Sequence, residues 1–299
     1  MNNQISKIEF FKLRSLSGKL SDTFKFVNEN LNVLVKLSSY ILLPLALLLG
    51  LFIVVQNKIT DMRMLMSLPE GELITLFAFG LLGILVALLG VSIFVALIYT
   101  LIHEYQVRDS ISLLSLRDIK KLLIVNIKKI WHLIPVFILI FAVFLVFTGV
   151  LAKLSFYTLI VTIPLFFILS IPLSYTGYIY LYEDIKLFPA VWKSYKIGMP
   201  TLGSSFAVVL FSAIFIFIIC IVSSMPFWVA SIVNNLSIVS VLGGDTPTLP
   251  GYFSILLYVL AVFSIYVHYI SQIFLIIAMG FQYFSTTVSC AEKLEENQV

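Results

Sequence analysis

His268 is the one ionisable side chain near the middle of a long apolar stretch of this chain, and Tyr266, Tyr269 and Gln272 accompany it. A titratable residue at the depth of a bilayer is costly and marks a functional site by default. We therefore consider His268, Tyr269 and Gln272 as an intramembrane polar site that binds a substrate or a lipid headgroup. The alternative is an interhelical hydrogen bond that fixes packing, which is worth about 1 kcal/mol.

A second histidine stands beside an acid, at His103 and Glu104. A zinc-binding helix needs two histidines four residues apart with the glutamate between them, and position 107 holds Val107. We interpret His103 as an anchor at the membrane interface. The sequence contains no Ser/His/Asp set, phosphate loop or cysteine cluster. We therefore expect no catalytic residue, no cofactor and no metal site.

Small residues recur at spacings of three and four at Gly80, Gly83, Ala87 and Gly90. Such a stripe lies on one face of a helix and lets another helix approach closely. The stripe predicts helix packing, either within the chain or between two copies, and we favour the contact within the chain.

The elements that carry these residues are membrane-spanning helices. Hydrophobic residues make up 61% of the 299 residues and charged residues only 11%, whereas an ordinary soluble domain has about 25% charged residues. The apolar runs have helical length and no strand-like alternation, which predicts an all-α polytopic fold in one transmembrane domain. We place the six spans at residues 37–55, 73–102, 130–151, 156–180, 202–222 and 252–284.

Three amphipathic stretches, at residues 20–34, 115–129 and 187–196, are predicted to lie in the membrane interface. In the second of them, apolar residues recur every three or four positions and basic residues occupy the other face. We expect these basic side chains to contact anionic headgroups: Arg117, Lys120, Lys121, Lys128 and Lys129.

Positive charge predicts the orientation of the six spans. Of the 19 Lys and Arg residues, only Lys58, Arg63 and Lys153 fall on the face opposite the termini. This bias places both termini in the cytoplasm and the protein in the cytoplasmic (inner) membrane. Anionic lipid accounts for the basic face, so the charge does not imply nucleic acid as a partner.

The chain shows a threefold pattern in which an interfacial helix precedes a hairpin of two spans, at roughly 16–109, 111–184 and 185–293. Each even-numbered span ends in aromatic residues followed by an acid. These endings contain Tyr99, His103, Glu104 and Tyr105; Tyr178, Tyr180, Tyr182 and Glu183; and Gln282, Tyr283, Phe284 and Glu292.

Two further features concern the second half of the chain. Pro164 and Pro172 should bend the fourth span, either for structural reasons or to line a transport site. We interpret residues 223–251 as the connection before the last span, with a cover over the outer mouth of the bundle as the alternative.

In two segments a short helix with aromatic and basic residues is followed directly by a span. These segments are LSDTFKFVNENLNVLVKLSSYILLPLALLL and AVWKSYKIGMPTLGSSFAVVLFS. In this architecture the chain resembles bacterial six-helix inner-membrane proteins and the membrane domain of glycerophosphodiester phosphodiesterases. The resemblance does not imply the phosphodiesterase activity, because that catalytic domain would be a separate soluble barrel.

These observations favour a non-catalytic integral membrane protein that interacts with lipid or supports a membrane enzyme or transport complex as an accessory subunit. Its expected partners are membrane lipids and either another protein or a second copy of the chain. The alternative is a small permease or transporter of lipid or hydrophobic solute, with a path between the fourth span and His268. An intramembrane enzyme is a weaker third interpretation.

Overall fold

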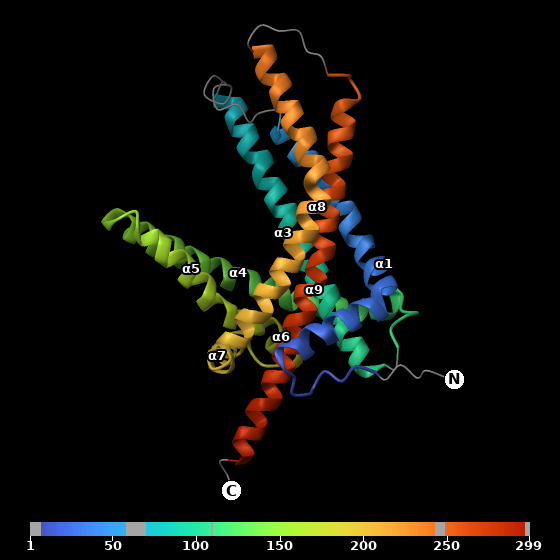
Figure 1. Cartoon of the computed structure of the whole chain (residues 1–299), viewed down its shortest axis with the longest axis vertical. Helices are drawn as coiled ribbons and strands as arrows, with labels where there is room; N and C mark the ends of the chain where they lie inside the picture. The colour runs from blue at the N-terminus through green and yellow to red at the C-terminus, as the bar shows by residue number, and fades with distance from the viewer. Residues whose placement is uncertain (1–6, 58–69, 109, 243–248, 297–299) are drawn as a thin grey trace. The chain divides into compact units, whose positions relative to one another are not determined.

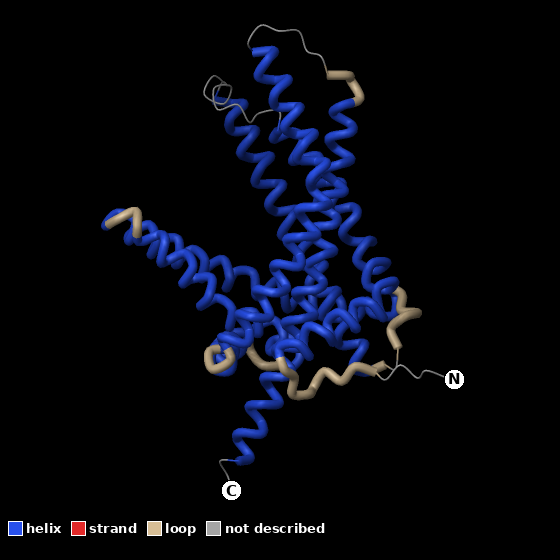
Figure 2. The backbone as a smooth tube through the Cα atoms, in the orientation of Figure 1, coloured by secondary structure: helices blue, strands red, loops and turns tan. Residues whose placement is uncertain are grey.

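The computed structural model describes residues 7–57, 70–108, 110–242 and 249–296. Within these ranges every regular element is helical (Figure 2), so the fold is all-α as predicted. Lys58, Arg63 and most of the turn-rich stretch after Leu242 lie outside the described residues. Six helices are long and apolar enough to cross a membrane.

Two of the predicted interfacial helices are continuous with the spans that follow them. Helix α1 (Leu16–Asn57) covers both predicted elements at the start of the chain. Helix α4 (Leu116–Leu154), with Ser115 as its N-cap, covers residues 116–129 and 130–151. The stretches that join each pair contain no glycine or proline, so the backbone hydrogen bonds continue across them. Helix α3 (Glu70–Val107) contains the second predicted span.

The fourth span is broken into three elements: α5 (Thr158–Ser170), the 3-10 helix η1 (Ile171–Ser174) and α6 (Tyr175–Tyr182). The break falls at Pro172, which has no N–H to donate and whose ring displaces the carbonyl one turn earlier. Pro164 lies within α5, which continues past it. Helix α7 (Leu187–Gly198) follows, with Pro189 in its first turn and Gly198 at its end.

The last two helices extend beyond the predicted spans. Helix α8 runs from Leu202 to Leu242, so most of the stretch that we interpreted as a connection is helical. This stretch is apolar, and its Pro226 is accommodated inside the helix. Helix α9 (Phe253–Glu296) likewise continues past residue 284.

The chain divides into two compact units. Unit 1 contains Met1–Leu34, Val95–Ala213 and Phe274–Val299, and unit 2 contains Val35–Phe94 and Ile214–Ile273. Unit 2 therefore contains parts of the hairpins of the first and third predicted repeats, whereas the whole hairpin of the second repeat belongs to unit 1.

An aromatic cluster forms the core of unit 1. The ring of Phe10 stacks on that of Phe281 with centroids 4.7 Å apart, and Phe26 meets Tyr105 at 4.7 Å. The backbone N–H of Ile8 donates to the Tyr105 hydroxyl at 3.1 Å, so the segment before α1 is part of this core. In the same unit α4 and α5 lie side by side as a hairpin (Figure 1), and no side chain of α5 is buried.

Unit 2 is held together by close helix approaches at glycines. A Cβ atom on Gly83 would lie 3.1 Å from the Phe52 ring, and one on Gly90 would lie 2.4 Å from Leu45. Gly83 and Gly90 of the small-residue stripe therefore lie against α1 of the same chain. Helix α1 also approaches α9, since a Cβ atom on Gly50 would lie 2.7 Å from Val262 of α9.

Candidate functional site

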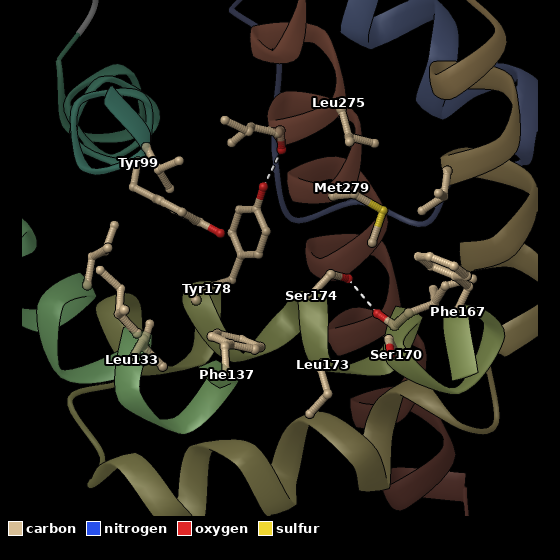
Figure 3. A pocket seen from close by; sticks show the side chains of 17 residues that line it. Tyr99, Leu133, Phe137, Phe167, Ser170, Leu173, Ser174, Tyr178, Leu275 and Met279 are labelled. Carbon is tan, nitrogen blue, oxygen red and sulfur yellow. Dashed lines mark hydrogen bonds between the residues drawn. The ribbon is translucent and has the colours of Figure 1, made fainter. Parts of the chain in front are cut away.

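Unit 1 contains a cavity of about 460 Å³, which we call the tyrosine cavity. Figure 3 shows Tyr99 and Tyr178 beside one another at this cavity, with Met279 reaching from α9 toward Phe167. Cavities of about 300–1,000 Å³ are typical of small-molecule sites. The lining is drawn from α3, α4, α5, η1, α6, α8 and α9: Val95, Tyr99, Ile130, Leu133, Ile134, Phe137, Phe167, Ser170, Ile171, Leu173, Ser174, Gly177, Tyr178, Val209, Leu275, Ile276 and Met279.

Most hydroxyl groups at the tyrosine cavity already donate to backbone carbonyls. Ser170 donates to Phe166 O at 2.7 Å and Ser174 donates to Ile171 O at 2.6 Å. The hydroxyl of Tyr178 donates to the carbonyl oxygen of Ile276 (Figure 3). These three hydroxyl protons are already used in hydrogen bonds within the protein, so the cavity offers a ligand chiefly apolar surface. An acyl chain fits that chemistry, because each buried CH₂ group contributes about 0.8 kcal/mol.

The tyrosines beside the cavity come from the ends of three predicted spans. The rings of Tyr99 and Tyr178 lie 4.6 Å apart, and those of Tyr178 and Tyr283 lie 5.4 Å apart. Tyr182 donates to the carbonyl oxygen of Tyr99 at 2.9 Å, and Tyr283 donates to Glu183 at 2.7 Å. The aromatic endings noted in the sequence thus meet in one cluster.

A buried polar network crosses unit 1 near this cluster. The ammonium of Lys19 donates to Ser204 at 3.0 Å, and Ser204 donates to Gln282 Oε1 at 3.1 Å. The Nε2 atom of Gln282 donates to Ser205 at 3.2 Å, and Ser205 shares a hydrogen bond of 2.6 Å with Tyr175. This network joins α1, α6, α8 and α9 through side chains that are mostly inaccessible to solvent.

Helix α7 supports the break in the fourth span. Ser194 donates to the carbonyl oxygen of Pro172, and Tyr195 donates to that of Leu169 at 2.9 Å. Within a membrane, backbone carbonyls at a helix break need such partners. Burial raises the pKa of the Tyr195 hydroxyl, so this group stays protonated and continues to donate.

The first half of α4 carries its charges on one exposed face. Arg117, Lys120, Lys121 and Lys128 are exposed and Lys129 is half-buried, whereas Ile119, Asn126 and Ile130 on the other face are buried in unit 1. Lys129 donates to Asp184 at 3.1 Å. The buried face continues into Leu133, which lines the tyrosine cavity, so the basic residues precede the cavity along one helix.

Unit 2 contains a second cavity of about 370 Å³, which we call the histidine cavity. It brings His268 and Tyr269 together with members of the small-residue stripe. Two hydroxyls, of Ser224 and Ser264, share a hydrogen bond of 2.6 Å at this cavity. Its lining residues are Leu49, Phe52, Ile53, Gly80, Gly83, Ile84, Ala87, Ser224, Ser264, Ile265, His268 and Tyr269.

The histidine cavity differs from the path that the sequence suggested. Its lining comes from α1, α3, α8 and α9, and none of the lining residues belongs to the kinked fourth span. Gln272 is half-buried and is not among the lining residues. The Nδ1 atom of His268 lies 3.3 Å from Cys220 Sγ, a partner that the sequence did not identify. Cys220 lies on another helix, far away in sequence, so no local pattern links the two.

His103 is not a lining residue of either cavity. Its ring is 5.8 Å from that of Tyr182, and the neighbouring Glu104 forms an ion pair with Arg108. Among the residues described, no group of three or more His, Cys, Asp and Glu side chains is arranged to hold a metal ion.

The chain is a polytopic all-α membrane protein. It has six helices that are long and apolar enough to cross a membrane, and many of its large hydrophobic side chains are exposed. No protein-family model, curated protein or solved structure matches it.

Proposed function

We propose that the protein is a non-catalytic lipid-binding protein of the cytoplasmic membrane. In this proposal the tyrosine cavity receives an acyl chain, and the basic residues at the start of α4 attract the anionic headgroup. Its physiological role is that of an accessory or scaffold subunit whose partner is a membrane enzyme or transport complex. The architectural likeness to the membrane domain of glycerophosphodiester phosphodiesterases is part of the same proposal.

The observation that carries this proposal is the composition of the tyrosine cavity. Most of its lining is aliphatic or aromatic, and three of its hydroxyls donate to the backbone. A polar substrate would find few partners there, whereas a hydrocarbon chain needs none. Ile130, which lines the cavity, follows Lys128 and Lys129 along α4, so the basic turns of this helix directly precede the part that lines the cavity.

The proposed orientation has both termini in the cytoplasm, which places the basic half of α4 beside the anionic cytoplasmic leaflet. A lysine or arginine near that surface contributes about 1 kcal/mol to membrane attraction. Cysteine-accessibility labelling of single-cysteine variants near each terminus of the intact cell membrane tests this orientation.

Native mass spectrometry of the gently extracted protein tests the lipid proposal. The wild-type protein should retain phospholipid, and Leu275→Trp should lose it because the larger side chain fills the cavity at which Leu275 lies. Leu256→Trp is the matched control, since Leu256 is an exposed position of the same helix and does not line the tyrosine cavity. Equal lipid retention by all three proteins would contradict the proposal. Proteins that co-purify with the wild type identify candidate partners.

A second candidate function is a permease for a small lipophilic solute. The specific observation that favours it is the histidine cavity, where four helices surround polar groups within an apolar wall. Substrate-dependent flux in proteoliposomes tests it, with His268→Ala expected to reduce the flux.

A further inference from the structure

Three contacts among His268, Cys220 and Ser271 in unit 2 determine which ring nitrogen of His268 carries the proton. The Ser271 hydroxyl donates to the carbonyl oxygen of His268 at 2.7 Å. Ser271 Oγ also lies 3.6 Å from Cys220 Sγ, and Cys220 Sγ lies 3.3 Å from His268 Nδ1. The three contacts form a ring that begins and ends on His268.

Only one assignment of protons makes all three contacts hydrogen bonds. A carbonyl oxygen can only accept, so the single Ser271 proton is directed to it. The contact between Ser271 and Cys220 must then use the thiol proton, with Ser271 Oγ as acceptor. The contact between Cys220 and His268 consequently uses a proton on Nδ1, with the sulfur as acceptor. A neutral imidazole with its proton on Nδ1 has a lone pair on Nε2.

Cys220 and Ser271 do not line the histidine cavity, whereas His268 does. Because Nδ1 is directed to Cys220, Nε2 is the polar atom that the imidazole offers to the cavity. Tyr269 and the Ser224–Ser264 pair also line the cavity. In that pair one of the two hydroxyl protons lies between the oxygens, and the other can be donated to a ligand. No carboxylate or ammonium is among the lining residues.

We propose that the histidine cavity binds an uncharged lipophilic molecule that carries a hydroxyl group, an alcohol or a phenol, whose O–H donates to Nε2 of His268. The apolar part of the ligand packs against Phe52, Ile53 and Ile84, which line the same cavity. An uncharged ligand matches a lining without ionic groups, since an unpaired charge is costly in such surroundings. This inference concerns unit 2 and does not depend on lipid binding in the tyrosine cavity.

The proton assignment can be measured directly. The chain has three histidines, so the ¹⁵N spectrum of histidine-labelled protein is simple, and the signal missing from His268→Asn identifies His268. The pattern expected is that of the Nδ1–H form. A signal of the Nε2–H form would overturn the assignment and reverse the hydrogen-bonding preference of the site.

Binding of 1-naphthol and 1-methoxynaphthalene to the full-length protein in detergent tests the ligand class. Equilibrium dialysis against empty micelles corrects for partitioning. The two probes share a ring system, but the ether has no proton to donate, so wild-type protein should bind it about five- to tenfold more weakly, as expected for one hydrogen bond. This comparison requires no variant that might misfold.

Three variants locate the hydrogen bond. His268→Asn retains an N–H near Cys220 but removes Nε2, so it should bind 1-naphthol about as weakly as the ether. His268→Gln supplies an acceptor near the Nε2 position and should retain part of the preference, and Cys220→Ser preserves the contact ring and should retain it fully. Equal binding of both probes by wild-type protein, or an undiminished preference in His268→Asn, would overturn the proposal.

Discussion

Gly177 lies directly against Tyr99: a Cβ atom on Gly177 would lie 2.5 Å from the Tyr99 hydroxyl oxygen and 3.0 Å from its Cζ atom. Both residues line the tyrosine cavity, one from α6 and the other from α3. The absence of a side chain at Gly177 therefore permits the close approach of these two helices and places Tyr99 beside Tyr178.

Gly177→Ala should lower the stability of the protein by about 1–3 kcal/mol, the usual cost of adding a methyl group to a packed site. Thermal unfolding in detergent measures the effect. Removing the hydroxyl in Gly177→Ala/Tyr99→Phe should recover part of the loss, because the shortest contact disappears while the contact to Cζ remains.

Gly203→Ala provides the matched control for this prediction. Nothing lies within 4 Å of a Cβ atom at Gly203, which is near the start of α8. Alanine favours a helix over glycine by about 1 kcal/mol, so this variant should be as stable as wild type or more so. A Gly177→Ala protein with unchanged thermal stability would show that the two helices are not in close contact.

Gln282→Met should destabilise unit 1 by about 1–3 kcal/mol, because it leaves Ser204 and Ser205 without their amide partner in a buried network. The side chains are similar in length, so packing changes little. Gln272→Met serves as the control, because Gln272 is a half-buried residue of the same helix. This substitution should lower the stability less. Chemical unfolding of both variants provides the comparison, and equal stability would argue against the network.

Lys120→Gln/Lys121→Gln/Lys128→Gln should weaken the retention of anionic lipid, because three exposed charges are removed from one face of α4. Each should contribute about 1 kcal/mol, and the effect should decrease at high salt. Lipid content measured in nanodiscs of phosphatidylglycerol and of phosphatidylcholine tests this. Lys153→Gln, at the other end of α4, should leave the preference for anionic lipid unchanged.

Local sequence patterns predicted the features that depend on neighbouring residues in the chain, such as helix length and helix breaks. Uninterrupted apolar runs revealed the six spanning helices, and Pro172 indicated the break in the fourth span. Aromatic residues recur at the ends of three spans in the sequence. Tyr99, Tyr178 and Tyr283 are among them, but the pattern did not indicate that their rings would be in contact.

The features that depend on long-range packing were not predicted. The tyrosine cavity is assembled from side chains that are individually ordinary for a membrane span, such as Leu133 and Met279. The partner of His268 could not be inferred because Cys220 lies on a different helix. The fifth span was predicted to end at residue 222, whereas α8 continues past Pro226 to Leu242.

Photocrosslinking of retained lipid tests the central claim most directly. Protein is extracted from membranes that contain a phospholipid with a photoactivatable acyl chain, bulk lipid is removed, and the remaining lipid is crosslinked and mapped by peptide mass spectrometry. We predict labelling of peptides that contain Phe137 and Met279, which line the tyrosine cavity, and its loss in Leu275→Trp. Labelling spread evenly over exposed positions such as Phe217 and Ile218 of α8, and unchanged in that variant, would contradict the proposal.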